Sequence, residues 1–325
     1  MTNKPSVLIT EPVDPAGPSL LESEAIIRYR SDYESWEDVL DEADEFDAVI
    51  VRTTPIDASF IDRASRLAVI SKHGVGLDNI DVGAATDRGI AVCRVEGAND
   101  RAVAEHAVAM ILAIRKQLVN TTTDIRSGRW DRAGYDTHTL AHDTVGLFGC
   151  GAIGQRVLAL LEGFDVDRLV YDPYVDAAAV PGGVTYVNKK LELFEQADVV
   201  SIHAPLTAET VGAIDATALA ALGSDGIIVN TARGGIIDED ALMAALDMGS
   251  IAGAGLDVFV DEPPADDHPL ATHPRIVTSP HIAGNTVESR VALSRGAANH
   301  VRTVLDGGLP PSTVNMDAIK HHFEL

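Results

Sequence analysis

Short apolar runs rich in β-branched residues alternate with longer stretches of helical spacing along nearly all of the 325 residues. Continuous apolar runs of this kind are typical of strands that are buried on both faces. Strands that alternate with helices predict βαβ units, and therefore an α/β fold with parallel, doubly wound sheets. The predicted strands are residues 7–10, 48–52, 67–71, 90–93, 144–148, 169–172, 184–187, 199–203, 227–231, 254–258 and 276–279.

The predicted strands fall into two groups, which indicates two domains. Four strands precede the helical pattern that starts near Asn99, and seven follow it. A further helix is predicted from Val287 to Leu305, where no strand remains for it to cover, so we expect it to return to the first group. The prediction is a discontinuous domain of residues 1–98 and 286–325, with a second domain of residues 99–285.

The charge balance argues against two classes of partner. The chain has 49 acidic and 25 basic residues, a formal net charge of −24, and only six of the basic residues are lysine. Such a surface repels phosphate backbones and anionic lipid headgroups, so we expect neither a nucleic acid nor a membrane as a partner. Many carboxylates with few lysines also suggest adaptation to high salt, which screens their mutual repulsion.

The sequence points to the cytoplasm and to no metal. Two cysteines, Cys93 and Cys150, are too few for a disulfide framework or a four-cysteine zinc site. The N-terminus has no apolar leader, and no segment has the length and hydropathy of a membrane span. His138 and His142 have the helical spacing of a metal pair but no carboxylate helix nearby, so we expect no metal site.

One glycine-rich segment predicts a dinucleotide site. Gly149, Gly151 and Gly154 form a G-x-G-x-x-G motif between a predicted strand and a predicted helix. Gly149 permits a tight turn, Gly151 allows the backbone to approach a pyrophosphate, and Gly154 permits close packing of the helix. Asp172 ends the next strand, 18 residues after Gly154. Its carboxylate suits a ribose diol and would repel a 2′-phosphate, which favours NAD over NADP.

Three later segments place polar side chains at the ends of consecutive predicted strands. They contain Arg233, Glu262 and His281. Because the carboxyl ends of parallel strands meet at one edge of a sheet, we expect the three residues at one ligand site. A guanidinium can hold a carboxylate and polarise the adjacent carbonyl, while a histidine beside a carboxylate can transfer a proton. This combination suits the reduction of a 2-keto acid by hydride.

At these residues the chain resembles the D-isomer-specific 2-hydroxyacid dehydrogenase family. The resemblance implies a Rossmann NAD-binding domain, a flavodoxin-like substrate domain and a homodimer in which residues 99–129 pack across the two-fold axis. The segments that carry it occur in the family's order and cover most of the chain: 72–80, 103–106, 149–154, 171–173, 203–207, 230–235, 257–264 and 279–284.

The family likeness implies a role for each matching residue. Arg233 would bind the substrate, Glu262 would pair with His281, and His281 would be the proton donor and acceptor. The other substrate-side residues would be Arg52 and the loop His73, Gly74, Val75 and Gly76. The residues expected to contact NAD are Val103, Gly149, Gly151, Ala152, Ile153, Gly154, Asp172, His203, Pro205, Thr207, Thr231, Ala232, Arg233, Asp257, His281 and Gly284.

The substrate remains open at this level. Within the family the likeness is greatest to members that oxidise 3-phospho-D-glycerate, although Lys72 and His73 replace a more usual Arg-Ala. Arg52, Lys72 and His73 could form a cationic pocket for a phosphate or a second acid group. A glyoxylate, hydroxypyruvate or general 2-keto acid reductase is an alternative. A second class, NAD-sensing proteins similar to the C-terminal binding protein corepressors, typically has Trp where this chain has Gly284.

Overall fold

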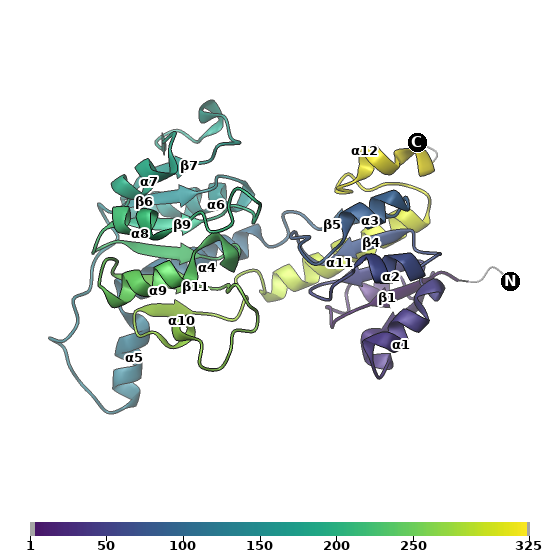
Figure 1. Cartoon of the computed structure of the whole chain (residues 1–325), viewed down its shortest axis with the longest axis horizontal. Helices are drawn as coiled ribbons and strands as arrows, with labels where there is room; N and C mark the ends of the chain where they lie inside the picture. The colour runs from purple at the N-terminus through teal and green to yellow at the C-terminus, as the bar shows by residue number, and fades with distance from the viewer. Residues whose placement is uncertain (1–3, 324–325) are drawn as a thin grey trace. The chain divides into compact units, whose positions relative to one another are not determined.

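The computed structural model describes residues 4–323. The chain divides into two compact units (Figure 1), of which unit 1 takes in the chain up to Asn99 and again from Asn285, and unit 2 spans Asp100–Gly284. Each unit contains one sheet whose strands all pair in parallel. Both units are therefore α/β, as the alternating pattern predicts.

Unit 1 has a five-stranded sheet in the order β2-β1-β3-β4-β5. This is the flavodoxin-like order, in which the direction of winding reverses between β1 and β3. The strands are β1 (Ser6–Ile9), β2 (Ile26–Tyr29), β3 (Ala48–Val51), β4 (Val69–Lys72) and β5 (Ala91–Arg94). The helices are α1 (Trp36–Asp41), α2 (Ala58–Arg63), α3 (Val82–Asp87), α11 (Val287–Leu305) and α12 (Met316–Ile319).

Alternate residues of each strand face different helices, which explains why most strands of unit 1 are apolar throughout. In β1, Val7 and Ile9 share a core with α11, whereas Leu8 lies in the core on the opposite face. The contribution of α11 includes Ala297 and Val301, both fully buried. A helix predicted without a sheet in its own half of the sequence thus covers the first sheet.

The sequence pattern missed one strand, β2. It pairs in parallel with β1 at the edge of the sheet, and most of its side chains are exposed. Its sequence, Ile-Ile-Arg-Tyr, lacks the continuous apolar run that marks the other strands, because an edge strand needs less burial. Unit 1 therefore has five strands within the described residues, and not the predicted four.

Unit 2 has a seven-stranded sheet in the order β12-β11-β10-β9-β6-β7-β8. This is a Rossmann-type order, whose winding reverses between β6 and β9. The strands are β6 (Thr144–Phe148), β7 (Asp167–Tyr171), β8 (Thr185–Tyr186), β9 (Val199–Ile202), β10 (Ile227–Asn230), β11 (Gly253–Leu256) and β12 (Ile276–Thr278). The helices are α4 (Asp100–Arg115), α5 (Leu118–Arg126), α6 (Ala152–Leu161), α7 (Lys190–Gln196), α8 (Ala216–Leu222), α9 (Glu239–Asp247) and α10 (Pro269–Thr272).

Acidic residues cap several of these helices. Asp57, Asp81, Asp215 and Asp238 precede α2, α3, α8 and α9, and each carboxylate accepts a backbone N–H of the first turn at 2.9 to 3.0 Å. An aspartate at this position satisfies an otherwise unpaired donor and complements the helix dipole. Some of the excess negative charge thus has a local structural role.

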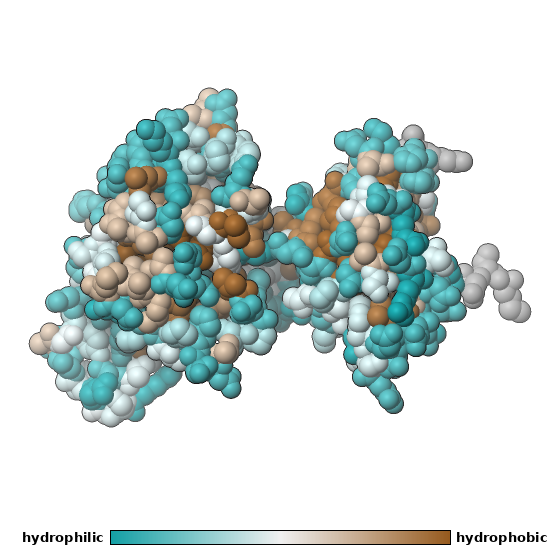
Figure 2. Space-filling model, viewed as in Figure 1, coloured by the Kyte–Doolittle hydropathy of each residue, from teal (hydrophilic) through white to brown (hydrophobic). Residues whose placement is uncertain are grey.

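The remaining acidic side chains contribute to a polar exterior. The face of the molecule in Figure 2 is largely hydrophilic, with separate apolar patches. Within residues 4–323, no helix combines the length and the hydropathy that crossing a membrane requires. The same residues contain no group of three or more His, Cys, Asp or Glu side chains arranged to hold a metal ion.

Candidate active site

A histidine–carboxylate pair lies beyond two adjacent strands of unit 2. His281 follows β12, and Glu262 lies in the loop after β11. The Nδ1 atom of His281 is 2.6 Å from Oε2 of Glu262, whose other oxygen accepts the backbone N–H of Phe259 at 3.1 Å. With Nδ1–H directed at the carboxylate, Nε2 of this half-exposed ring is left for another partner. The pair therefore has the arrangement of a proton donor held by its neighbour.

Asp257 anchors the loop that carries His281. Its backbone carbonyl accepts the N–H of His281 at 2.7 Å, and its carboxylate accepts those of Ile282 at 2.9 Å and Ala283 at 2.8 Å. His281 itself has φ of 52°, a left-handed conformation that a side-chain-bearing residue adopts at a cost. The fully buried Asp257 supplies the hydrogen bonds that hold this conformation.

Two further side chains complete this anchor, and both lie in segments that carry the family likeness, although no role was expected for either. The hydroxyl of Ser279 donates to the Asp257 carboxylate and lies 2.9 Å from Nε2 of His106, on α4. Since the Ser279 proton points at Asp257, the Ser279 oxygen accepts from His106. Ser279 and His106 are 173 positions apart in the chain, so only the folded sheet and helix bring them together.

Arg233 follows β10 in a loop that Asn230 shapes. The buried Asn230 side chain accepts the N–H of Ala232 at 3.0 Å and donates to the carbonyl of Arg233 at 2.8 Å. One nitrogen of the Arg233 guanidinium also donates to the carbonyl of Ala232 at 2.7 Å. The amide of Asn230 thus sets the turn from which the arginine extends.

The next residue, Gly234, brings the loops after β10 and β11 into contact. A Cβ atom placed on Gly234 would lie 2.0 Å from the backbone carbon of Phe259, three residues before Glu262. Only glycine allows this approach. Arg233, Glu262 and His281 are therefore carried by neighbouring loops at the carboxyl ends of β10, β11 and β12, the edge of the sheet that their positions after predicted strands indicate.

The predicted dinucleotide loop has room for a phosphate. Gly149 has φ of 102° at the end of β6, and a Cβ on Gly151 would meet no atom within 4 Å. Gly151 precedes α6 and provides no side-chain cap, so the first amides of this helix keep their hydrogen-bonding capacity. The Oγ1 atom of Thr231 is buried without a partner among the described residues. These features fit a bound dinucleotide.

Asp172 lies next to this loop at the end of β7. Its carboxylate accepts the N–H of Cys150 at 2.8 Å and that of Tyr174 at 2.9 Å. A carboxylate oxygen can accept more than one hydrogen bond, so capacity remains for a ribose hydroxyl. The position agrees with the role expected for an acidic residue in such a site.

The other residues expected to contact NAD lie in the same unit. Val103 is buried on α4, while His203, Pro205 and Thr207 follow β9. His203 shares a hydrogen bond at Nε2 with the hydroxyl of Ser201, 2.9 Å away. Burial lowers the pKa of His203 to about 4, so the ring is neutral at neutral pH. The His203 ring is thus suited to forming part of the surface of the predicted NAD site and not to carrying charge.

The other residues expected on the substrate side, Arg52 and the loop His73–Gly76, lie in unit 1. Arg52 follows β3, and the His73–Gly76 loop follows β4. Glu11, which follows β1, accepts the backbone N–H of Arg52 at 2.9 Å and that of Thr53 at 2.7 Å. Glu11 carries no sequence signal for this role, because it lies 41 positions before Arg52 and no local pattern links the two.

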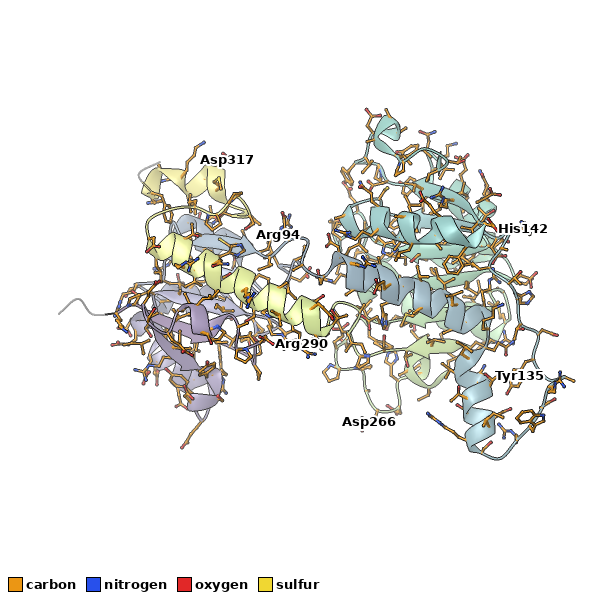
Figure 3. All side chains as sticks on the ribbon, turned by 180° about the vertical axis from the view of Figure 1, so that it is seen from behind. Arg94, Tyr135, His142, Asp266, Arg290 and Asp317 are labelled. Carbon is orange, nitrogen blue, oxygen red and sulfur yellow. The ribbon has the colours of Figure 1, made fainter. Side chains whose placement is uncertain are left out.

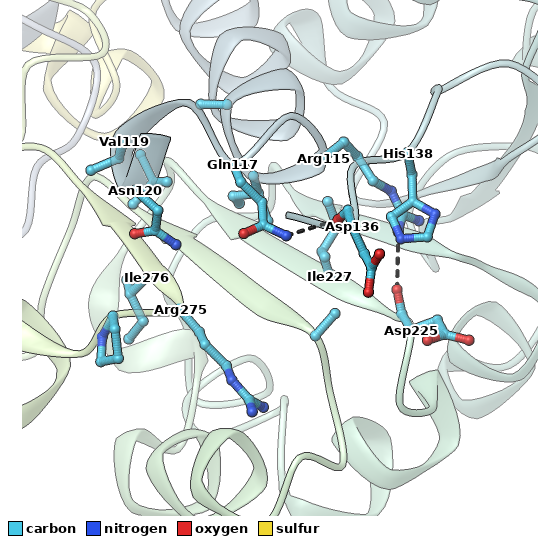
Figure 4. A pocket seen from close by; sticks show the side chains of 15 residues that line it. Arg115, Gln117, Val119, Asn120, Asp136, His138, Asp225, Ile227, Arg275 and Ile276 are labelled. Carbon is cyan, nitrogen blue, oxygen red and sulfur yellow. Dashed lines mark hydrogen bonds between the residues drawn. The ribbon is translucent and has the colours of Figure 1, made fainter. Parts of the chain in front are cut away.

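Unit 2 also has a cavity that contains none of the predicted site residues. It has a volume of about 220 Å³ and lies where α4 meets α5, beside β12 (Figure 4). Arg115 donates there to the carbonyl of Asp225 at 3.0 Å, and Gln117 donates to that of Asp136 at 2.8 Å. These two hydrogen bonds connect segments that are far apart in the chain, which favours a structural role for the residues that line this cavity.

Comparisons with known proteins agree with this geometry. Residues 108–283 match the family described as D-isomer specific 2-hydroxyacid dehydrogenase, NAD binding domain. A D-3-phosphoglycerate dehydrogenase of Mycobacterium leprae is 40% identical over 84% of this chain and 52% of its own length. A glyoxylate reductase of Thermofilum pendens is 37% identical over 98% of this chain and 96% of its own.

Solved structures show the same likeness. A crystal structure of a Thermus thermophilus protein superposes with a TM-score of 0.88 at 32% identity, covering 95% of this chain and 99% of that one. The chain spans little more than half the length of the phosphoglycerate dehydrogenases it matches, between 52% and 60%. The region that matches the family model contains the glycine loop, Arg233, Glu262 and His281. The chain belongs to the D-isomer specific 2-hydroxyacid dehydrogenase family.

Proposed function

We propose that the chain is an NAD-dependent D-2-hydroxyacid dehydrogenase whose leading substrate is 3-phospho-D-glycerate. The observation that carries the proposal is the His281–Glu262 pair, 2.6 Å apart, on the loop next to that of Arg233. Several relatives that are 33% to 40% identical to this chain over the aligned residues are named D-3-phosphoglycerate dehydrogenase. The open glycine loop and Asp172 support NAD as the cofactor.

Arg233, His281 and Glu262 each have a separate role in the proposed reaction. Arg233 holds the substrate carboxylate and polarises the C2 oxygen. In the direction of oxidation, Nε2 of His281 takes the hydroxyl proton, and in reduction it returns a proton to the C2 oxygen. Glu262 holds the ring through Nδ1 and stabilises the imidazolium that forms. NAD held at the glycine loop and Asp172 would supply the hydride-transfer chemistry at C2.

A second candidate is a glyoxylate or hydroxypyruvate reductase. The likeness to the Thermofilum pendens glyoxylate reductase favours it, because that match covers nearly the whole of both chains. The chemistry at Arg233, Glu262 and His281 is the same for both candidates. The two candidates differ in the part of the substrate beyond C2. Glyoxylate has no further group there, whereas 3-phosphoglycerate carries a charged phosphate.

We also propose a homodimer through residues 99–129. Three large apolar side chains of α5 are exposed, Leu118, Val119 and Ile125, and so is Trp130 just beyond this segment, with 80% of its surface accessible. Exposed apolar residues concentrated on one element are typical of an interface. Sedimentation as a monomer at the assay salt concentration would contradict this proposal.

The test of the proposed function is the rate of NADH oxidation with a panel of 2-keto acids. The panel contains phosphohydroxypyruvate, hydroxypyruvate, glyoxylate and pyruvate, assayed in about 2 M KCl to screen the acidic surface. We expect turnover with the highest kcat/KM for phosphohydroxypyruvate. Highest kcat/KM for glyoxylate or hydroxypyruvate would select the second candidate instead.

Substitution of His281 tests the mechanism in the same assay. We expect His281→Ala to lower kcat by about 10²- to 10⁴-fold, the usual contribution of a general acid or base. NADH binding, followed by fluorescence, is the control that separates lost chemistry from lost structure. A loss of kcat of less than about tenfold would contradict the role assigned to His281.

A further inference from the structure

The loop that carries Glu262 has few attachments to the rest of unit 2. This Glu262 loop spans residues 259–268 between β11 and α10, and Asp266 marks it in Figure 3. All of residues 260–267 except Pro264 are exposed. In the described part of the chain, hydrogen bonds from residues 260–267 to groups outside the loop reach only Glu239 and His281. A segment with so few contacts opens easily unless those contacts hold it.

One carboxylate, that of Glu239, contacts both ends of the Glu262 loop. Its Oε1 atom accepts the backbone N–H of Val260 at 2.9 Å, and its Oε2 atom lies 3.5 Å from Nε2 of His268. Val260 is the second residue of the loop, and His268 is the last. Only about a fifth of each of the two side chains is exposed, 21% for Glu239 and 22% for His268, so solvent screens their attraction incompletely. Glu239 therefore bridges the ends of an exposed span.

The chain that leaves β10 brings Glu239 to this position. Gly234 approaches the Glu262 loop so closely that a Cβ on it would lie 2.4 Å from the nitrogen of Val260. A short 3-10 helix, Gly234–Ile236, then leads into α9, whose first residue is Glu239. Asp238 provides the cap of α9, since its carboxylate accepts a backbone N–H of the first turn at 3.0 Å. The Glu239 carboxylate is thus available to the loop.

The packing of the His268 ring directs one of its nitrogens at Glu239. The ring lies edge-on against the buried ring of Phe259, with the centroids 5.7 Å apart and the planes at 77°. Its Nδ1 atom is buried and has no partner among the described residues. A proton on Nδ1 would be a buried donor without an acceptor, whereas a proton on Nε2 faces the carboxylate. The neutral ring therefore carries its proton on Nε2.

This attachment reaches the pair that transfers the proton. Phe259 directly precedes Val260, and its backbone N–H donates to Oε1 of Glu262 at 3.1 Å. The other oxygen of Glu262 lies 2.6 Å from Nδ1 of His281. A shift of the loop at Val260 therefore moves the carboxylate that orients the His281 ring. A misplacement of about 1 Å in such a group can lower a rate about 100-fold.

We propose that Glu239, together with His268, is a positioning residue that holds Glu262 against His281. It acts through the Glu262 loop and not on the reacting atoms. The first turn of α9 thereby adds a second connection between the loops after β10 and β11, beside the close approach of Gly234. This inference rests on the proposed function, because it names what keeps the proton-transfer pair together.

Steady-state kinetics of the full-length chain with NADH tests the proposal, using whichever of phosphohydroxypyruvate and glyoxylate the wild type prefers. We expect Glu239→Ala to lower kcat about 10- to 100-fold and to change the Kd of NADH less than about threefold. Glu239→Gln keeps an oxygen for the N–H of Val260, so its kcat should lie between those of the wild type and Glu239→Ala. His268→Gln removes one of the two attachments and should lower kcat about 3- to 10-fold.

Asp240→Ala is the matched control. Asp240 is the next residue in the first turn of α9, is exposed, and makes no side-chain hydrogen bond or ion pair with any described residue. Its substitution removes the same charge from the same helix end without touching the Glu262 loop. We expect kcat within about twofold of the wild type. A fall in kcat as large as that of Glu239→Ala would overturn the inference, since the charge of the helix end would then explain both.

A double variant separates positioning from general damage. If Glu239 acts through Glu262, adding Glu239→Ala to Glu262→Ala should lower kcat by less than about a further threefold, because the group that Glu239 positions is already lost. Two effects that multiply in full would show that Glu239 acts independently of Glu262 and would overturn the inference.

A spectroscopic measurement separates this inference from the proposed function. Ring-nitrogen NMR shows whether neutral His281 carries its proton on Nδ1, as the contact with Glu262 requires. We expect this form in the wild type and in Asp240→Ala, and a change toward the Nε2–H form in Glu239→Ala; loss of the signal in His281→Ala assigns it. If no keto acid is turned over but this difference is found, the proposed function fails and the positioning role stands. If turnover is found and Glu239→Ala leaves the tautomer unchanged, the positioning role alone fails.

Discussion

The carboxylate of Glu11 holds the loop of residues 52–54, which lies about 40 positions later in the sequence. Burial raises the pKa of Glu11. Hydrogen bonds from the Thr10 hydroxyl and from the backbone N–H groups of residues 52–54 lower it by a larger amount, so the pKa is about 2. Hydrogen bonds that favour the charged form are therefore stronger than the cost of burial. Arg52, which the family likeness places at the substrate, depends on this clamp for its position.

We expect Glu11→Gln to destabilise the protein by about 1.5–3 kcal/mol at pH 7, the usual range for hydrogen bonds to a charged group. Because the folded-state pKa lies below the usual value of 4.5, the stabilisation is present above about pH 4.5 and is lost as the pH falls toward 2. Urea unfolding at pH 7 and at pH 3 measures the difference.

The control for this experiment is Asp317→Asn, whose carboxylate side chain is 99% exposed. We expect it to change the free energy of unfolding by less than about 0.5 kcal/mol at either pH. An effect of Glu11→Gln that is equal at pH 7 and pH 3 would contradict the role of the ionised carboxylate.

At the scale of elements, the site depends on how the loops after β10, β11 and β12 meet. Their strands are neighbours in the sheet, so the loops leave it side by side. Gly234 allows the first loop to touch the backbone of the second, and Asp257 ties the second to the third. The spacing between Arg233, Glu262 and His281 is therefore a property of three connected loops and not of single side chains.

Substitution of adjacent glycines tests this connection. In Gly234→Ala the new Cβ would lie 2.0 Å from the Phe259 backbone, so the loops must separate. We expect a loss of about 1–3 kcal/mol in stability, as for other overpacked sites, together with a fall in kcat of at least about tenfold. Thermal unfolding and steady-state kinetics measure the two effects.

The matched control is Gly235→Ala. Its Cβ would meet only the side chain of Leu206, at 3.4 Å, which is ordinary van der Waals contact. We expect stability within about 0.5 kcal/mol of the wild type and nearly unchanged kcat. Similar losses in the two variants would show that the contact between Gly234 and Phe259 is not what holds the loops.

Across the whole molecule, most carboxylates lie on a mutually repelling surface, and only a few have specific hydrogen-bond partners. The net charge is −24, and the basic residues are mostly arginine. Aspartates at helix N-termini, buried Asp257 and clamped Glu11 have local partners, but most other carboxylates are exposed. Their mutual repulsion opposes the compact state, and screening by salt reduces it.

We therefore expect the free energy of unfolding to rise between about 0.1 and 2 M KCl. Chemical unfolding by urea, which adds no ions, measures it at each salt concentration. Chloride and potassium also act on the apolar surface, so an equal series in a neutral osmolyte serves as the control. Stability that does not rise with KCl would contradict adaptation to salt.

Much of the fold could be predicted because its signals are local. A buried parallel strand is a short apolar run, and the spacing of Val287–Leu305 marks a helix whose bounds agree with α11. The strand β2 escaped detection because an exposed edge strand carries too few apolar residues. Arg233, Glu262 and His281 could be proposed as site residues because polar residues directly after buried strands are conspicuous and their loops follow the order of the sheet.

Local patterns predict most of the elements, the glycine turn and the edge of the sheet at which Arg233, Glu262 and His281 lie, since each depends on a few consecutive residues. Long-range packing brings Arg290 to the same cavity of unit 1 as Arg52, where Lys72 is not among the lining residues, and it brings His106 to Ser279. These contacts join elements that are far apart in the chain. Their geometry is set by how helices pack on the sheets, and no periodicity within one segment records it.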